Sequence, residues 1–136
     1  VGRSFGLRAM RLPDEPLNVP GAQSLSLAGR IGQCFLGIWL GILRGWLRRA
    51  GIVGNDRVYG IRDSGSLVRE QMLSLLAELP DGVTEIFLHP ARGGWDDVDV
   101  AARPYRFEEE FHALVDTDVK SAPSSSGATL TAFRGI

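Results

Sequence analysis

The sequence predicts an α/β fold, in which about four parallel strands are covered on the outside by helices. Candidate strands and helices alternate in the order β, α, β, α, β, α, β, which is typical of a parallel sheet. The chain has 136 residues, enough for one domain with its own core. Its apolar fraction of 44% and charged fraction of 23% are those of an ordinary globular protein. We therefore treat residues 1–136 as a single domain.

The expected strands are short and are bounded by residues that favour turns. Segment 83–88 is the clearest, because it combines Val, Ile, Phe and Leu and ends at His89 and Pro90. A loop that holds three prolines follows the first strand. In chain order, the other expected strands are 7–11, 57–61 and 128–133.

The expected helices place apolar residues at spacings of three and four. The longest has arginines in its last turns and Gly51 as its C-terminal stop. Ser64 or Ser66 is expected to cap the next helix, and a helical turn is expected near Val119. In chain order, the expected helices cover 1–5, 23–50, 66–79 and 105–115.

Charge is distributed unevenly, although the net charge at pH 7 is only −1. Residues 1–57 carry eight arginines against three acidic residues, a balance of +5. Residues 58–136 carry seven basic and thirteen acidic residues, a balance of −6. Two different surfaces are therefore expected, but the near-neutral total gives no reason to expect a nucleic acid partner. Cys34 is the only cysteine, which excludes an internal disulfide, and we expect it to pack within the longest helix.

His89 is the strongest candidate for a catalytic residue. It follows an apolar strand, and parallel α/β folds bind ligands and carry out chemistry at the carboxyl ends of their strands. An imidazole there can ligate a metal or act as a general acid or base, although a structural histidine in a loop is an equally good interpretation. Arg11 and Asp63 also follow candidate strands. Each is expected either to contact substrate at the same edge or to form a structural salt bridge.

Two other patterns are typical of metal sites but are incomplete. Glu108 and Glu109 precede His112 at helical spacing, yet sites of this kind need a second copy and further carboxylates. The acidic loop 96–99 lacks the later glycine and glutamate of a calcium loop. We interpret both as solvated surface and predict no metal ligand in this chain.

The long helix has two interpretations. Residues 31–43 are thirteen residues without a charge, too few for a bilayer crossing, which needs about 20. Trp39, Trp46 and the basic ends suit a membrane interface, and glycines at every fourth position suit close contact with another helix. Residues 31–47 therefore form either a core helix packed on the sheet or a surface that binds a membrane or a partner.

Several segments together resemble a known family. VGRSFGLRAMRLPDEP, an apolar helix, and AGIVGNDRVYGIRDSGSLVREQMLSLLAELPDGVTEIFLHPA follow one another in the order and spacing of the YdjC-like carbohydrate deacetylases. The chain is most similar to the branch associated with hopanoid biosynthesis, and the likeness runs from residue 1 to about residue 91. It weakens through the acidic loop and resumes loosely in the last helix and strand.

The resemblance implies a partial (β/α) barrel-like fold and a hydrolase that removes the N-acetyl group from an amino sugar. It implies a divalent metal, usually magnesium, and a sugar-bearing lipid as the substrate of the hopanoid branch. Of the family's site residues, only the histidine of the strand–His–Pro motif carries over, onto His89. The family's metal ligands, an early Asp-Asp pair and histidines of the first and middle parts, have no counterpart here.

A closed barrel takes about 250 residues, so the resemblance leads us to expect the C-terminal portion of a longer deacetylase. Such a chain would bind no metal alone and would work with a missing N-terminal half. An amino-sugar or glycolipid substrate is expected, and a cytoplasmic location that includes the surface of the inner membrane. The alternative function is a non-catalytic membrane- or partner-binding module built on helix 31–47.

Overall fold

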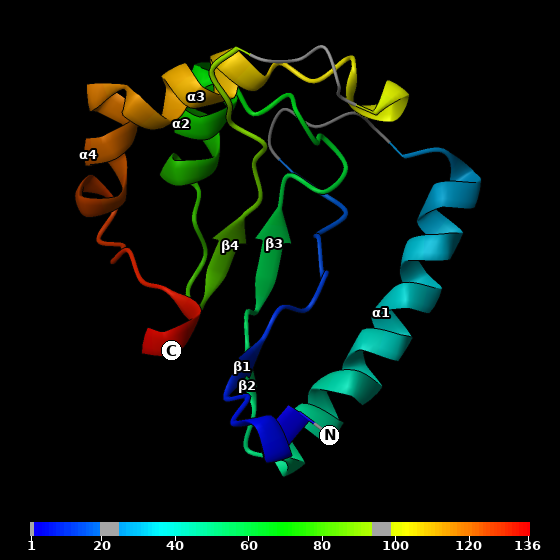
Figure 1. Cartoon of the computed structure of the whole chain (residues 1–136). Helices are drawn as coiled ribbons and strands as arrows, with labels where there is room; N and C mark the ends of the chain where they lie inside the picture. Colours follow the sequence, from blue (N-terminus) through cyan, green and yellow to red (C-terminus); the bar gives the residue numbers. More distant parts are fainter. Residues whose placement is uncertain (1, 20–24, 94–98) are drawn as a thin grey trace.

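The computed structural model describes residues 2–19, 25–93 and 99–136, and it contains helices and short parallel strands (Figure 1). The expected α/β class is confirmed. In chain order the elements are η1 (Gly2–Phe5), β1 (Ala9–Met10), α1 (Leu27–Arg49), β2 (Val53–Gly54), β3 (Arg57–Tyr59), α2 (Arg69–Ala77), β4 (Thr84–Ile86), η2 (Val100–Ala102), α3 (Phe107–Val115), α4 (Thr117–Ser125) and η3 (Phe133–Gly135).

The strands form two parallel pairs that follow each other along one stretch of chain. β1 pairs with β2 through Ala9↔Val53, and β3 pairs with β4 through Val58↔Glu85. β2 and β3 are separated only by residues 55–56, so residues 53–59 act as one interrupted central strand. β1 therefore lies on one side of this strand and β4 on the other.

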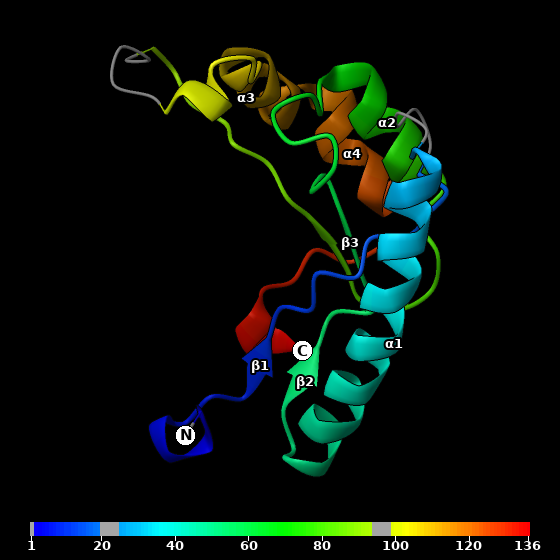
Figure 2. The same ribbon diagram turned by 90° about the vertical axis from the view of Figure 1, so that its right-hand side faces the viewer.

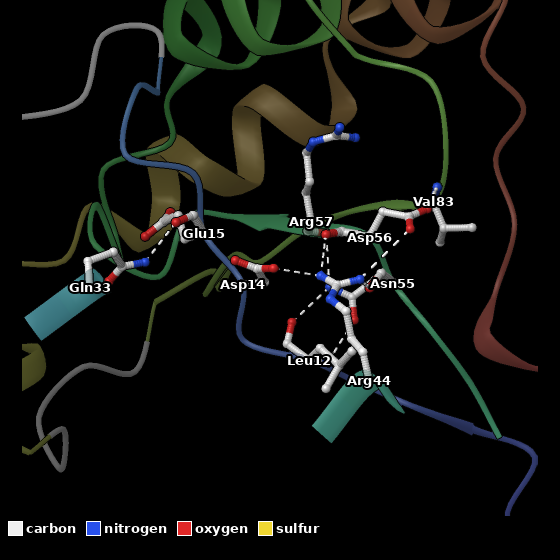
Figure 3. Close-up of polar contacts among 9 residues, drawn as sticks. All are labelled: Leu12, Asp14, Glu15, Gln33, Arg44, Asn55, Asp56, Arg57 and Val83. Carbon is white, nitrogen blue, oxygen red and sulfur yellow. Dashed lines mark hydrogen bonds and ion pairs between the residues drawn. The ribbon is translucent and has the colours of Figure 1, made fainter. Parts of the chain in front are cut away.

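Asn55 bridges the interruption with its side chain, which is fully buried (Figure 3). Its Oδ1 accepts from the Leu12 backbone N–H at 2.7 Å, and its Nδ2 donates to the carbonyl oxygens of Leu12 and Arg57, each at 2.9 Å. Backbone pairing then resumes, because the Val58 N–H donates to the Asp14 carbonyl at 3.0 Å. The amide thus replaces the missing pair of peptide groups in the ladder.

The helices bury their apolar residues on one side of these strands. α1 packs on β1 and β2, with Leu40 and Leu47 against Leu12 and Ile52. α2, α3 and α4 pack on one another around a second cluster that includes Tyr59 of β3. In Figure 2, α1, α2 and α4 lie on the same side of the strands, whereas η3 lies on the other side of β1.

The ends of the longest helix follow ordinary capping rules. Ser26 caps α1 by accepting from the Gly29 N–H, and residues 23–24 of the expected helix lie outside the described residues. Gly51 is the predicted stop, with a φ of 64°, and its N–H donates to the Arg48 carbonyl. The Ile52 N–H donates to the Leu47 carbonyl, which completes a Schellman motif whose apolar contact joins the same two residues.

Two expectations about the elements are wrong and one is confirmed. Neither Ser64 nor Ser66 caps α2, because the helix begins at Arg69 after Val68, which provides no side-chain cap. The helical turn expected near Val119 is confirmed and is part of a longer helix, α4. Segment 128–133 is not a strand, since it is largely exposed and buries no apolar face that would hold it against β4.

We predict that Asn55→Ala lowers the free energy of unfolding by about 2–4 kcal/mol. The substitution leaves the buried N–H and C=O of Leu12 without partners, and each such group costs about 1–3 kcal/mol. Urea unfolding followed by circular dichroism measures the change. Asn18→Ala, at an exposed asparagine, is the matched control. Equal stability of the two variants would show that the Asn55 amide does not join the sheets.

We predict that acidification weakens the junction between α2 and α4. The pKa of Asp116 is lowered by the backbone N–H of Val119, with help from Arg69, whose side chain donates to it at 3.0 Å. Because the folded pKa lies below the ordinary value of 3.8, the stabilisation is complete above that pH and is lost as the pH falls further.

The Asp116→Asn variant should therefore show a smaller loss of melting temperature between pH 7 and pH 3 than the wild type. Thermal unfolding at several pH values measures this difference. Asp81→Asn, at an exposed aspartate, should keep the wild-type pH dependence. An unchanged slope in Asp116→Asn would contradict the assignment.

Candidate functional site

Strand alternation separates two sets of side chains along β4 and the residues that follow it. Ile86 and Leu88 pack against the cluster formed by α2, α3 and α4. Because side chains of a strand alternate between its faces, Glu85, Phe87 and His89 belong to the opposite face. A row of polar and aromatic groups therefore leads along that face to the carboxyl end of β4.

His89 lies at the end of this row, as the sequence predicts, and is surrounded by aromatic rings. Its ring centroid is 4.6 Å from that of Phe87, in an edge-to-face arrangement, and 4.8 Å from that of Tyr105. Tyr105 is followed by Phe107, at 5.6 Å between ring centroids. The Nδ1 atom of His89 is buried and has no hydrogen-bond partner among the described residues. This imidazole is positioned by packing and retains an unused hydrogen-bonding nitrogen.

Glu110 of α3 holds the backbone at His89. Its side chain is fully buried, with Oε2 accepting from the His89 N–H at 2.6 Å and Oε1 from the Leu67 N–H at 3.0 Å. Leu67 lies directly before α2, so this one carboxylate joins the end of β4, the start of α2 and α3.

Gly65 determines where Tyr105 lies. It has a φ of 76°, and a Cβ atom at this position would lie 2.2 Å from Cγ of Tyr105. The carbonyl of Gly65 also accepts from the Arg106 N–H at 2.7 Å. A glycine is therefore required for the loop after β3 to pack directly on the ring that contacts His89.

Arg11 is on the same face but earlier along the sheet than His89. It forms an ion pair with Glu85 and lies over the Phe87 ring, at 5.0 Å from the centroid. Its side chain is 48% exposed, whereas Oε2 of Glu85 is buried without a described partner. The structural salt bridge that we kept as an alternative is present, and substrate binding by Arg11 remains a prediction.

Asp63 lies in the loop after β3, which a second buried carboxylate holds in place. Glu15 accepts from three consecutive N–H groups, those of residues 60–62, at 2.9–3.2 Å, and from Nε of Arg62 at 2.9 Å. Arg62 also donates to the carbonyls of residues 16 and 17. Asp63 is half-buried, and in the described part of the chain no hydrogen bond or ion pair joins it to Arg11 or His89. Its predicted contact with substrate stays a prediction.

The weaker candidates are mostly surface features. His112, Glu108 and Glu109 are exposed, and Glu109 pairs with Arg106, which confirms the solvated helix face. Asp99 accepts from the Ala101 N–H at the start of η2, and the rest of the acidic loop, 96–98, lies outside the described residues. The expectation that Cys34 packs is wrong, because it lies on the exposed side of α1.

Comparison with known protein families shows which family the chain belongs to. Residues 1–124 match the family described as YdjC-like protein. The chain belongs to the YdjC-like family. Members of this family are carbohydrate deacetylases. Searches of curated proteins and of solved structures gave no match.

The described residues do not fit a resident divalent metal. Among residues 2–19, 25–93 and 99–136, no three histidine, cysteine, aspartate or glutamate side chains converge as a ligand set. His89 is surrounded by aromatic rings, and the two buried carboxylates of the YdjC-like domain accept backbone N–H groups. We therefore derive no chemical step through a metal.

Sequence reasoning missed Glu110 and Tyr105, which support His89. Glu110 directly follows Glu108 and Glu109, which we interpreted as solvated, and we assigned it no role. Glu110 is three residues from both Phe107 and Ala113, so it lies on the apolar face of α3. This spacing could have indicated that Glu110 is buried. Nothing in the sequence indicates the contact between Gly65 and Tyr105, because it joins loops that are forty residues apart.

We predict that Glu110→Gln destabilises the YdjC-like domain by about 1–3 kcal/mol, because a buried amide offers one acceptor oxygen to two N–H donors. Chemical unfolding measures the loss, and the NMR shift of the His89 amide proton reports the broken contact. Glu108→Gln, exposed on the same helix, should change neither quantity. Identical behaviour of the two variants would rule out the role assigned to Glu110.

Proposed function

We propose that this chain takes part in the hydrolysis of the N-acetyl group of an amino sugar, with His89 at the reacting edge. Membership of a family of carbohydrate deacetylases supports the reaction class. The observation that carries the assignment of the site is the position of His89. It follows the carboxyl end of a parallel strand, with its backbone held by Glu110 and one ring nitrogen unused.

The chemistry requires one proton transfer that an imidazole can perform. Water adds to the acetyl carbonyl, the C–N bond breaks, and acetate and a free amine are formed. The amine nitrogen must gain a proton as it leaves, and we assign this transfer, or the orientation of the acetamide, to His89. General acid–base catalysis of this kind contributes about 10²–10⁴-fold to a rate.

The surroundings of His89 suit a sugar ring. Phe87 and Tyr105 flank the imidazole, and aromatic rings offer flat apolar surfaces that complement the C–H face of a pyranose. We propose Arg11 and Asp63 as the donor and the acceptor for substrate hydroxyl groups. The half-exposed side chain of Arg11 supports the first assignment. The second rests on the position of Asp63 in the loop after β3.

We also propose the barrel-like fold, the divalent metal and the lipid substrate that the family resemblance implies. The arrangement of β1, the central strand 53–59 and β4 as sequential neighbours is that of consecutive units in a (β/α) barrel, which supports a partial barrel here. We propose that an N-terminal half supplies the ligands of a divalent metal, magnesium by family resemblance. The hopanoid branch and a sugar-bearing lipid substrate remain proposals on the same basis.

A second candidate is a non-catalytic module that binds a membrane or a partner through residues 31–47. The observation that favours it is the exposure of Trp39, Trp46 and several other apolar residues of α1. In the described part of the chain, no helix combines the length and the apolarity that a bilayer crossing needs. We propose a cytoplasmic location with peripheral contact at the inner membrane.

We predict that His89→Ala lowers kcat by about 10²–10⁴-fold in the enzyme that contains this chain, because the proton transfer to the leaving amine is lost. Acetate release from N-acetylated chito-oligosaccharides measures kcat, and circular dichroism verifies folding. His112→Ala, at the exposed histidine of α3, should change kcat little. If His89→Ala left kcat unchanged and His112→Ala lowered it, the assignment of the site to His89 would be wrong.

A further inference from the structure

α1 carries a continuous row of exposed apolar side chains, which we call the apolar stripe. Its members recur at spacings of three and four, so they share one face of the helix over about 29 Å. Phe35 and Ile38 are 70% and 67% exposed, and Trp39 and Trp46 are both about half exposed. The stripe consists of Leu27, Ile31, Phe35, Ile38, Trp39, Ile42 and Trp46.

The stripe is separate from the face through which α1 joins the domain. Leu40 and Leu47 are buried against the sheet, and Leu36 and Leu43 pack beside them. In Figure 1, α1 forms an outer side of the molecule, away from the group of α2, α3 and α4. Packing within the described domain therefore accounts for one face of α1 and leaves the stripe in contact with solvent.

Positive charge accompanies the stripe. Arg30, Arg48 and Arg49 are exposed, and no acidic residue lies between residues 27 and 49. Arg44 differs, because it is held by Asp14 and by two backbone carbonyls and faces the sheet. The exposed side of α1 thus combines a wide apolar stripe that includes two tryptophans with exposed cations at both ends.

We propose that the stripe docks on the surface of a bilayer that contains anionic lipids. An amphipathic helix with apolar and tryptophan side chains on one face and arginines beside it lies in the interface plane of such a membrane. The arginines complement the negative surface potential, and each is worth about a fivefold increase in affinity. This location is independent of the chemistry assigned to His89.

Charge also argues against a second copy of this chain as the occupant. In an antiparallel pair of α1 helices, Arg30 of one copy would approach Arg48 and Arg49 of the other. In a parallel pair, each arginine would approach its own counterpart. No acidic residue on α1 compensates either arrangement, so the stripe repels itself electrostatically while it complements an anionic surface.

Vesicle binding tests the proposal directly. The chain is mixed with vesicles of phosphatidylcholine alone or of equal parts phosphatidylcholine and phosphatidylglycerol, and bound protein is separated by flotation. We expect binding to the anionic vesicles that weakens as salt is raised, and much weaker binding to the neutral ones. Lipids with brominated chains should quench the fluorescence of Trp39 and Trp46, measured in a Trp95→Phe background.

Three variants separate the contributions. Ile38→Glu should lower the affinity for anionic vesicles about tenfold or more, since a charge replaces a large apolar side chain in the stripe. The double variant Arg48→Gln, Arg49→Gln should lower it about 25-fold at low salt and leave the folded helix intact. Leu130→Glu makes the same kind of change at an 82% exposed residue outside α1 and should have no effect.

Several outcomes would overturn the proposal. Absence of flotation with anionic vesicles would do so, as would equal effects of Ile38→Glu and Leu130→Glu. Self-association in sedimentation experiments that Ile38→Glu abolishes, without vesicle binding, would assign the stripe to a second copy. Quenching of neither Trp39 nor Trp46 by brominated lipid would exclude insertion of this face.

Discussion

The sheet depends on one buried side chain, that of Asn55. Along residues 53–59 the central strand stops pairing with β1 and starts pairing with β4, and the planar amide of Asn55 covers the change. Two-stranded sheets are marginally stable by themselves in water. Because the amide joins Leu12 to the central strand, the two pairs become one three-stranded layer that the helices can cover. The bridge therefore fixes β1 and the loop after it against the central strand.

Two buried carboxylates then fix the loops that leave the sheet. Glu15 accepts three consecutive N–H groups after β3, and Glu110 accepts the N–H groups of His89 and Leu67. Both acids lie outside the strands whose ends they hold, so each loop is tied to a neighbouring element. A site built in this way has its backbone determined before any ligand arrives. The side chain of His89 is then oriented by the rings of Phe87 and Tyr105.

Local chemistry made part of the molecule predictable. The alternation of β1, α1, β3, α2, β4 and α3, the stop of α1 at Gly51 and the place of His89 after a strand depend on residues close together in sequence. The missed features depend on distant pairs. Glu110 accepts the Leu67 N–H across 43 residues of sequence, and Asn55 contacts Leu12 across the same separation. The prediction that Arg11 follows a strand is confirmed. Its ion pair with Glu85, in the middle of β4, shows that it lies earlier along the sheet than the edge at His89.

The exposure of α1 has a physical explanation in the polar contacts of its other face. Arg44 donates to Asp14 and to the carbonyls of Asn55 and Asp56, and Gln33 donates to the Glu15 carbonyl at 2.8 Å (Figure 3). These bonds attach the helix to the loop after β1 and to the break in the central strand. These bonds add to the apolar contact that Leu40 and Leu47 make with the sheet. Together they hold α1 in place while the apolar stripe stays exposed. The same arrangement leaves that surface free to bind elsewhere, on the side of the molecule that carries the basic half of the chain.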